Sequence, residues 1–380
     1  MLTLRWLAPA VVLWALCLSG PTACCQDPSF SQFYANRVYL NPAFVGLESG
    51  ISVTGISRLQ WYNADQGFRT VGLTVETQLP IVRLGLGLNL LSDTEGIGNL
   101  QTNQAGFVLS YTIPGRNNNI HFGMEGRIAQ KSLNWDALIF SDQLDPIYGV
   151  VSPTSLQPVL EKVTYGDFDF GIVWRREGDW GSGKKRLRDV RSQLGISVHH
   201  LPYLFSNSAK GNDSFLNRDA RIAPRITLHG GMIIPLKFFQ GSGLDISLSP
   251  NLKLDMQGYK PLNIKENINV TTFGMYGLIN GFYLGLLYQN RFFAPNATHT
   301  DAFILTIGGY ALSSKRSQSR DPRLFFGLSA DINSTGVGPV AGNAFELAFR
   351  YRFVPSAGLS VKNSKRRRNR KKQLDCKDFF

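Results

Sequence analysis

The sequence has few cysteines, and most of them lie at the very start of the chain. Cys17, Cys24 and Cys25 fall within the first 25 residues, which leaves Cys376 alone in the remainder. A single cysteine excludes a disulfide framework and a metal site built on cysteine pairs. We therefore expect neither a cofactor nor a metal.

Long hydrophobic runs are also missing. Beyond residue 50 no stretch of about 18 apolar residues occurs, and no long helical period appears. This excludes a bundle of membrane helices. The mean hydropathy of −0.09 still leaves open a membrane β-barrel, because the polar residues of a barrel's lumen offset its apolar exterior.

Catalytic signals are absent from the sequence as well. No G-x-S-x-G motif occurs, and the acids of segment 129–162 are spaced too loosely for a general acid and base pair. His199 and His200 are expected to point to opposite faces of one strand, so they would not share a metal ion, with or without His229. We expect no catalytic residues and no enzyme. The alternative is a hydrolase at a barrel rim, with a Ser or Asp paired to a His.

The first 25 residues have the features of an export signal. Arg5 precedes the apolar run WLAPAVVLWALCL, and small residues follow it. We predict a signal peptide over 1–25 and a mature chain that starts at Gln26, with a lipoprotein-like cleavage before Cys24 as the alternative.

What the sequence has in abundance is glycine and aromatic side chains in a period of two. The chain contains 38 glycines and 25 phenylalanines, and only 18% of its residues are charged. The stretch FELAFRYRF at 345–353 puts aromatic and apolar residues on one face and Glu346, Ala348, Arg350 and Arg352 on the other. The pattern predicts strands with two unlike faces.

Fourteen such stretches occur, separated by turn residues. They lie near 50–60, 68–78, 82–92, 99–112, 118–128, 163–175, 191–200, 222–235, 243–256, 264–278, 281–291, 300–310, 323–332 and 343–353. Their connections alternate between short turns, such as Asn280-Gly281, and longer segments, of which 129–162 and 201–221 are the longest. Two polar connections of moderate length, 176–190 and 311–322, interrupt the series of short turns. Short periplasmic turns and long outer loops are typical of bacterial outer-membrane barrels.

Two architectures compete for these strands. In a soluble sandwich the outer faces would be richly charged, whereas the second faces here carry glycine and small polar groups. A closed barrel in lipid explains both faces and leaves no free strand edge. We predict an all-β fold, a transmembrane antiparallel β-barrel of about fourteen strands over 50–353 in the cell outer membrane; the alternative is a soluble exported β-protein.

The start of the mature chain, QDPSFSQFYANRVYLNPAFVG, is polar and aromatic and is unlike a strand. Its elements Gln26-Asp27-Pro28, Phe30 to Tyr34, and Leu40 to Ala43 followed by Gly46 resemble the opening of the PorP/SprF family of outer-membrane proteins. That resemblance implies a part in the type IX secretion and gliding machinery of Bacteroidetes. The implied partners are other type IX components and secreted surface proteins.

Segment 26–49 has two interpretations: a short plug with its amides bonded to lumen groups at the periplasmic mouth, or a clasp that seals the barrel base. The residues expected to act as plug or to bind a partner are Gln26, Asp27, Pro28, Phe30, Ser31, Gln32, Phe33, Tyr34, Asn41 and Pro42.

The long connection 129–162 is unusually apolar for a surface loop. Either it constricts the lumen or it presents a patch to a partner, and we favour the partner. The contact residues expected there are Trp135, Phe140, Ile147 and Tyr148.

The basic tail, 354–380, is the part that departs from the resemblance. Its cations Lys365, Arg366, Arg367, Arg368, Arg370, Lys371 and Lys372 occupy seven of eight consecutive positions. With an even strand count the tail lies in the periplasm, where nucleic acid is not a partner. It either binds peptidoglycan, lipid phosphates or an acidic protein, or stays disordered.

Together these features predict a noncatalytic outer-membrane component that binds surface proteins and helps to export or anchor them. The alternative is a channel for small solutes.

Overall fold

The computed structural model describes most of the chain between residues 27 and 353. The described ranges are 27–48, 50–63, 67–156, 160–181, 187–205, 215, 222–236, 245–258, 268–290, 302–313, 322–334 and 342–353. The signal peptide, Gln26 and the basic tail with Lys365 to Lys372 lie outside them, so those predictions remain predictions.

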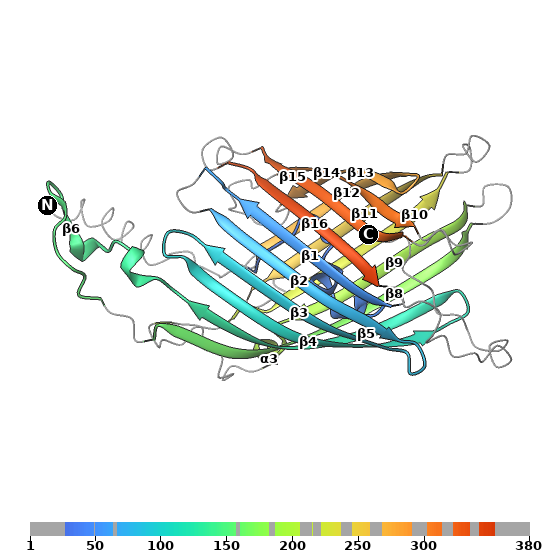
Figure 1. The fold of residues 1–380 in the computed structure, drawn as a ribbon, viewed down its shortest axis with the longest axis horizontal. Coiled ribbons are helices and arrows are strands. Elements are labelled where there is room, and N and C mark those ends of the chain that lie inside the picture. Colours follow the sequence, from blue (N-terminus) through green and yellow to red (C-terminus); the bar gives the residue numbers. More distant parts are fainter. Residues whose placement is uncertain are drawn as a thin grey trace, which may run out of the picture.

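Fourteen antiparallel strands close into one barrel, as predicted (Figure 1). Their bounds are β1 Ile51–Gln60, β2 Phe68–Leu79, β3 Leu84–Glu95, β4 Leu100–Pro114, β5 Asn118–Ser132, β8 Lys162–Trp180, β9 Leu187–His199, β10 Arg225–Pro235, β11 Ile246–Gln257, β12 Ile268–Ile279, β13 Phe282–Asn290, β14 Ala302–Ser313, β15 Pro322–Asn333 and β16 Ala344–Phe353. Neighbours in sequence pair with each other, and β1 closes the sheet on β16 with Ile51 opposite Phe353.

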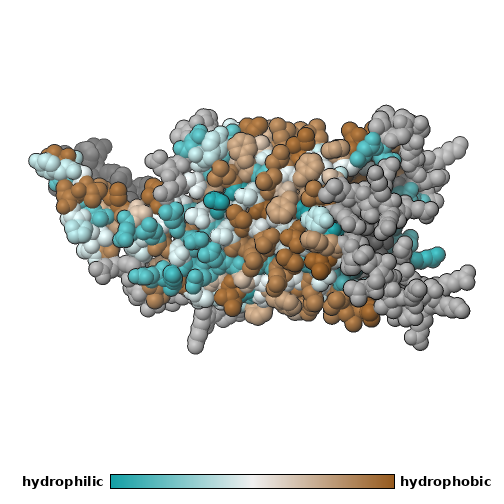
Figure 2. Space-filling model, viewed as in Figure 1, coloured by the Kyte–Doolittle hydropathy of each residue, from teal (hydrophilic) through white to brown (hydrophobic). Residues whose placement is uncertain are grey.

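The strands alternate between the two faces as their period of two requires. In β16, Phe345, Leu347, Phe349 and Phe353 are exposed on the outside, while Glu346 and Arg350 are buried in the lumen. Figure 2 shows apolar side chains gathered in a broad band over the strands. Closure of the sheet gives the backbone N–H and C=O groups of every strand a hydrogen-bonding neighbour, and it leaves an apolar outer surface for the outer membrane.

The two ends of the barrel differ in their connections. At one end, which we call the short-turn end, β2 and β3 are joined by residues 80–83, and β12 and β13 by Asn280-Gly281. Asn280 and Gly281 have φ of 50° and 90°, as a type I′ turn requires. The opposite, long-loop end carries the connections β5–β8 and β9–β10.

One predicted connection is shorter than expected. The sequence predicts a polar connection of moderate length over 176–190, but β8 continues to Trp180 and β9 begins at Leu187. The ladder extends past its apolar part, with a register shift between Gly178 and Trp180. Polarity was a poor guide there because strands that project beyond lipid need no apolar face.

Short elements complete the fold. They are α2 Arg37–Leu40 and η1 Pro42–Phe44 before the barrel, α3 Leu201–Phe205 after β9, and η2 Trp135–Ala137, η3 Ser141–Gln143, β6 Leu144–Asp145 and β7 Gly149–Val150 between β5 and β8. None of the helices in the described part of the chain is both long and apolar enough to span a bilayer.

Candidate functional site: a segment seated inside the barrel

Residues 27–48 lie inside the barrel, and we call them the lumen segment. Asp27 lies beside His200 and Arg225 at the long-loop end, whereas Gly46 lies against Gly85 at the short-turn end. The segment therefore runs through the lumen, whereas the two interpretations from the sequence placed it at the periplasmic mouth, as a plug or as a clasp at the barrel base. Almost every side chain from Phe30 to Leu47 is buried.

An apolar core fixes one side of the lumen segment. Phe30, Phe33, Tyr34 and Phe44 form one buried cluster with inward side chains of the wall. The wall residues of this cluster include Val173, Ile233, Tyr276, Tyr283, Leu287, Ile304 and Phe325. Each large apolar side chain buried in this way contributes about 1.5–3 kcal/mol relative to exposure.

The turn at Ser31 and Gln32 is held by one carboxylate. Glu346 Oε1 accepts from Ser31 N at 2.6 Å, and Oε2 accepts from Gln32 N at 2.9 Å. Arg58 forms ion pairs with both Glu346 and Asp331, which keeps the buried charges compensated. Asp331 in turn accepts from the Ser31 hydroxyl. β1, β15 and β16 thus bind the same turn.

A second buried ion-pair network holds the middle and the end of the lumen segment. Arg37 pairs with Glu48 at 2.8 Å and also with Glu76 of β2. Glu76 accepts from Gly46 N at 2.8 Å, and Arg350 Nη2 donates to Ala35 O at 3.0 Å. Burial opposes ionisation of Glu48, but the guanidinium groups, with Arg37 the nearest, lower its pKa to about 2.

The Leu40 to Ala43 element of the resemblance fits closely against the barrel wall. Asn41 caps η1 by accepting from Ala43 N at 2.9 Å, and its Nδ2 donates to Ile196 O at 3.0 Å and Ile172 O at 3.3 Å. Pro42 begins η1, where its missing N–H costs nothing. One asparagine therefore shapes the lumen segment and attaches it to β8 and β9.

Glycines in the wall make room for this backbone. A Cβ at Gly123 would overlap Ala43 N and the Pro42 carbonyl carbon, and one at Gly85 would overlap the Val45 carbonyl oxygen. Gly46 has φ of +68° and lies against Gly85, so it needs both a left-handed backbone and the absence of a side chain. Contact with the lumen segment thus explains the wall glycines at these two positions, Gly85 and Gly123.

The beginning of the lumen segment is anchored at the long-loop end. Asp27 Oδ2 lies 2.9 Å from His200 Nε2 and 3.1 Å from Arg225 Nη1. Burial opposes its ionisation, but the two cations together hold the Asp27 pKa well below its usual range. Behind it, His200 Nδ1 lies 2.6 Å from Asp167 Oδ2, and Arg127 pairs with Asp167 at 2.9 Å.

The predicted opposite orientation of the two adjacent histidines was wrong. β9 ends at His199, and His200 has φ of 60°, so both rings are buried, with His199 Nδ1 on Asp169 at 2.7 Å and His200 Nδ1 on Asp167. Among the described residues, no group of three or more His, Cys, Asp or Glu side chains is arranged to hold a metal ion. The nearby carboxylates face Arg127 instead.

Ser197, His199 and Asp169 lie in a chain that resembles a hydrolase triad in its distances. His199 Nε2 is 3.1 Å from Ser197 Oγ. The hydroxyl, however, donates to Leu40 O of the lumen segment at 2.8 Å, and all three side chains are buried. Because the Ser197 hydroxyl already donates its proton to Leu40 O and is buried away from any substrate, this serine attaches the lumen segment to the wall.

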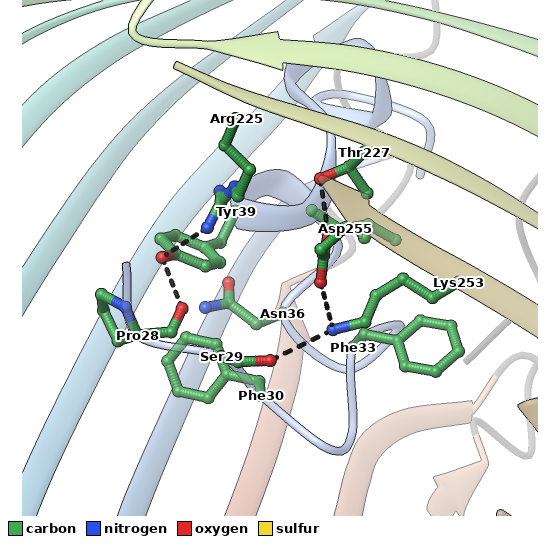
Figure 3. Close-up of a pocket in the computed structure, with 11 residues that line it drawn as sticks. Pro28, Ser29, Phe30, Phe33, Asn36, Tyr39, Arg225, Thr227, Lys253 and Asp255 are labelled. Atoms are coloured by element: carbon green, nitrogen blue, oxygen red, sulfur yellow. Dashed lines mark hydrogen bonds and ion pairs between the residues drawn. The ribbon is translucent and has the colours of Figure 1, made fainter. Parts of the chain in front are cut away.

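Little space remains between the first part of the lumen segment and β10 and β11 (Figure 3). Arg225 donates to the Tyr39 hydroxyl at 3.2 Å, which donates to Pro28 O, while Lys253 bridges Ser29 and Asp255. The cavity among these residues has a volume of about 20 Å³, enough for about one water.

The predicted residues of 129–162 lie far from this site. Between β5 and the described residue 156 the chain projects beyond the strands at the long-loop end (Figure 1). Trp135 and Phe140 stack with ring centroids 5.5 Å apart and are half-buried, whereas Ile147 and Tyr148 are exposed by 82% and 78%. The described residues of this connection do not constrict the lumen.

Sequence reasoning identified most of the lumen segment and missed its partners in the wall. Glu346, Arg58, Glu76 and Asp169 are single charged residues at inward positions of strands, and nothing local shows what they bind. The usable signal was a charged residue on the glycine-rich face of an apolar strand, since a buried charge requires a partner.

Comparison with known proteins gives a family. The family model described as type IX secretion system membrane protein PorP/SprF matches residues 23–351. No curated protein matches the sequence.

Among solved structures, Omp33 of Acinetobacter baumannii has a TM-score of 0.40 at 8% identity, over 81% of this chain and 100% of that one. CdiB of Acinetobacter baumannii has a TM-score of 0.40 at 9% identity, over 80% and 60%. OprB of Pseudomonas putida has a TM-score of 0.32 at 8% identity, over 80% and 93%.

Proposed function

Because this chain belongs to the PorP/SprF family of type IX secretion system membrane proteins, we propose that it is a noncatalytic component that binds surface proteins and helps to export or anchor them. It is an outer-membrane barrel, and the partners implied by its family are the other components of the type IX machinery.

The observation that carries this proposal is the filled lumen. Many strands of the wall bind the lumen segment: β1, β15 and β16 at Ser31, β2 at Arg37, β8 and β9 at Asn41, and β10 and β11 at its beginning. A barrel occupied by its own chain favours binding of a partner at an end over diffusion of solutes through the centre.

The two ends offer different surfaces for this role. The long-loop end carries the projecting connection with Ile147 and Tyr148, which suits a surface protein. The short-turn end is where β16 ends, so the cationic tail from Lys365 to Lys372 would act on that side, on peptidoglycan, lipid phosphate or an acidic partner.

Two measurements test the proposal. The tagged protein, extracted from its native membrane in mild detergent, should copurify with a secreted surface protein and other type IX components, identified by mass spectrometry. In planar bilayers it should not conduct, and deletion of residues 26–46 should produce conductance. Conductance of the intact protein, without any copurifying partner, would favour the small-solute channel.

A further inference from the structure

The connection between β5 and β8 has the construction of a docking arm. We call its residues 133–156 the arm. It projects beyond the barrel strands at the long-loop end (Figure 1) and carries the exposed side chains of Ile139, Leu144, Ile147, Tyr148, Val150 and Val151.

The arm is held in shape by its own contacts. Asp142 accepts from Ser155 N at 2.7 Å and from the Thr154 hydroxyl at 3.0 Å. Asp145 accepts from Ile147 N at 2.8 Å and Tyr148 N at 2.9 Å, which fixes the turn at the tip. The exposed apolar residues are therefore presented by a preformed hairpin, which lowers the entropic cost of binding.

Charge separates the arm from the rest of the chain. The protein has a formal net charge of +13, yet residues 133–156 contain Asp136, Asp142 and Asp145 and no lysine or arginine. Backbone donors lower the pKa of both Asp142 and Asp145, so these groups stay ionised. An anionic apolar tip is repelled by a surface of anionic lipid and attracts a cationic protein.

The hairpin also offers backbone groups for pairing. β6 and β7 pair with each other through Leu144–Val150 and Asp145–Gly149, and among the described strands neither has a second neighbour. An extended segment can add to such an edge, with alternate side chains directed to the apolar and the charged groups.

We propose that the arm docks an extended, cationic segment of a surface protein. Apolar side chains of that segment pack on Ile147 and Tyr148, while its Lys or Arg side chains lie near Asp136 and the other two carboxylates. This inference rests on the proposed function and names the site and the partner chemistry for it.

The test uses the full-length protein in detergent and fluorescent synthetic peptides that alternate valine with lysine, glutamate or serine. Fluorescence anisotropy should show binding of the valine–lysine peptide that weakens as salt is added, and little binding of the valine–glutamate peptide. The inference would be overturned if the lysine and glutamate peptides bound equally well, or if no peptide bound.

Variants locate the site. The double substitution Ile147→Ser and Tyr148→Ser should lower the affinity for the valine–lysine peptide by roughly tenfold or more. Asp136→Lys should lower that affinity and reduce its dependence on salt concentration. The matched control is Ile97→Ser, which removes a 63% exposed side chain from another connection at the same end and should leave affinity unchanged. A heat-dependent gel shift of the barrel checks folding of each variant.

Failure here is distinguishable from failure of the proposed function. If the tip variant retains a surface protein in copurification from cells and the lysine peptide does not bind, the arm is not the docking site while the function stands. If the wild-type protein copurifies with no surface protein, the proposed function fails whatever the peptides do.

Discussion

A valine in place of Gly123 should unseat the lumen segment. Gly123 lies on the inward face of β5, where an added Cβ would overlap backbone atoms of Pro42 and Ala43. Backbone cannot rotate away as a side chain can, so η1 would have to retreat by roughly 1.5 Å to reach a separation of about 3.5 Å.

The cost of that retreat follows from the hydrogen bonds around η1. Asn41 Nδ2 donates to Ile196 O at 3.0 Å, Ser197 donates to Leu40 O at 2.8 Å, and Ser110 donates to Val45 O at 2.7 Å. A movement of roughly 1.5 Å would break these three, at about 1 kcal/mol each. Overpacking adds about 1–3 kcal/mol. The sum, about 4–6 kcal/mol, shifts the seating equilibrium about a thousandfold or more.

Limited proteolysis of the purified protein is the assay. Gly123→Val should open residues 27–48 to cleavage while the strands stay protected, and it should raise conductance in planar bilayers. Valine favours strand structure, so the substitution should not destabilise strand β5 itself.

The control is Gly126→Val, on the outward face of the same strand, where the nearest atom is a Phe168 side-chain carbon at 3.2 Å. If Gly123→Val and Gly126→Val are cleaved alike and as slowly as the wild type, the close seating of the lumen segment is refuted.

Two further predictions concern the ends of the lumen segment. His200 is buried, which by itself would lower its pKa, but Asp27 and Asp167 raise that pKa to about 9. The stabilisation from protonated His200 is therefore complete below its ordinary pKa of about 6.5 and is lost as pH rises through about 9. The protection of the first lumen-segment amides against hydrogen exchange, measured relative to the base-catalysed intrinsic rate at each pH, should fall between pH 7 and 10, and His200→Gln should abolish that fall; an unchanged fall in the variant would contradict the prediction. Arg37→Met leaves Glu76 without its cation and leaves Glu48 with Arg350 as its ion-pair partner, and it should lower the free energy of unfolding by about 3–5 kcal/mol in denaturant titration. Adding Glu76→Gln should recover part of the loss, and the absence of recovery would show that the two side chains do not interact.

The strands and their faces could be predicted from the sequence. All fourteen expected strands occur, and the outward face of β16 is the aromatic face expected from FELAFRYRF. These features depend on a period of two and on turn residues a few positions apart, so each short stretch contains its own signal. The family resemblance was also visible locally, in about twenty residues around Phe30 and Asn41.

Only the tertiary structure decided where the lumen segment runs and what holds it. Ser31 and Glu346 are 315 positions apart in the chain, and Asn41 and Ile196 are 155 apart. Their pairing depends on closure of the sheet, which brings inward positions of strands distant in sequence around one axis. The inward turn of His200 depends on a single left-handed residue where β9 ends. Periodicity determines which face of a strand a side chain takes. The partner that it meets across the lumen is set by the closed sheet as a whole, because a pattern of a few residues contains no information about residues 155 or 315 positions away.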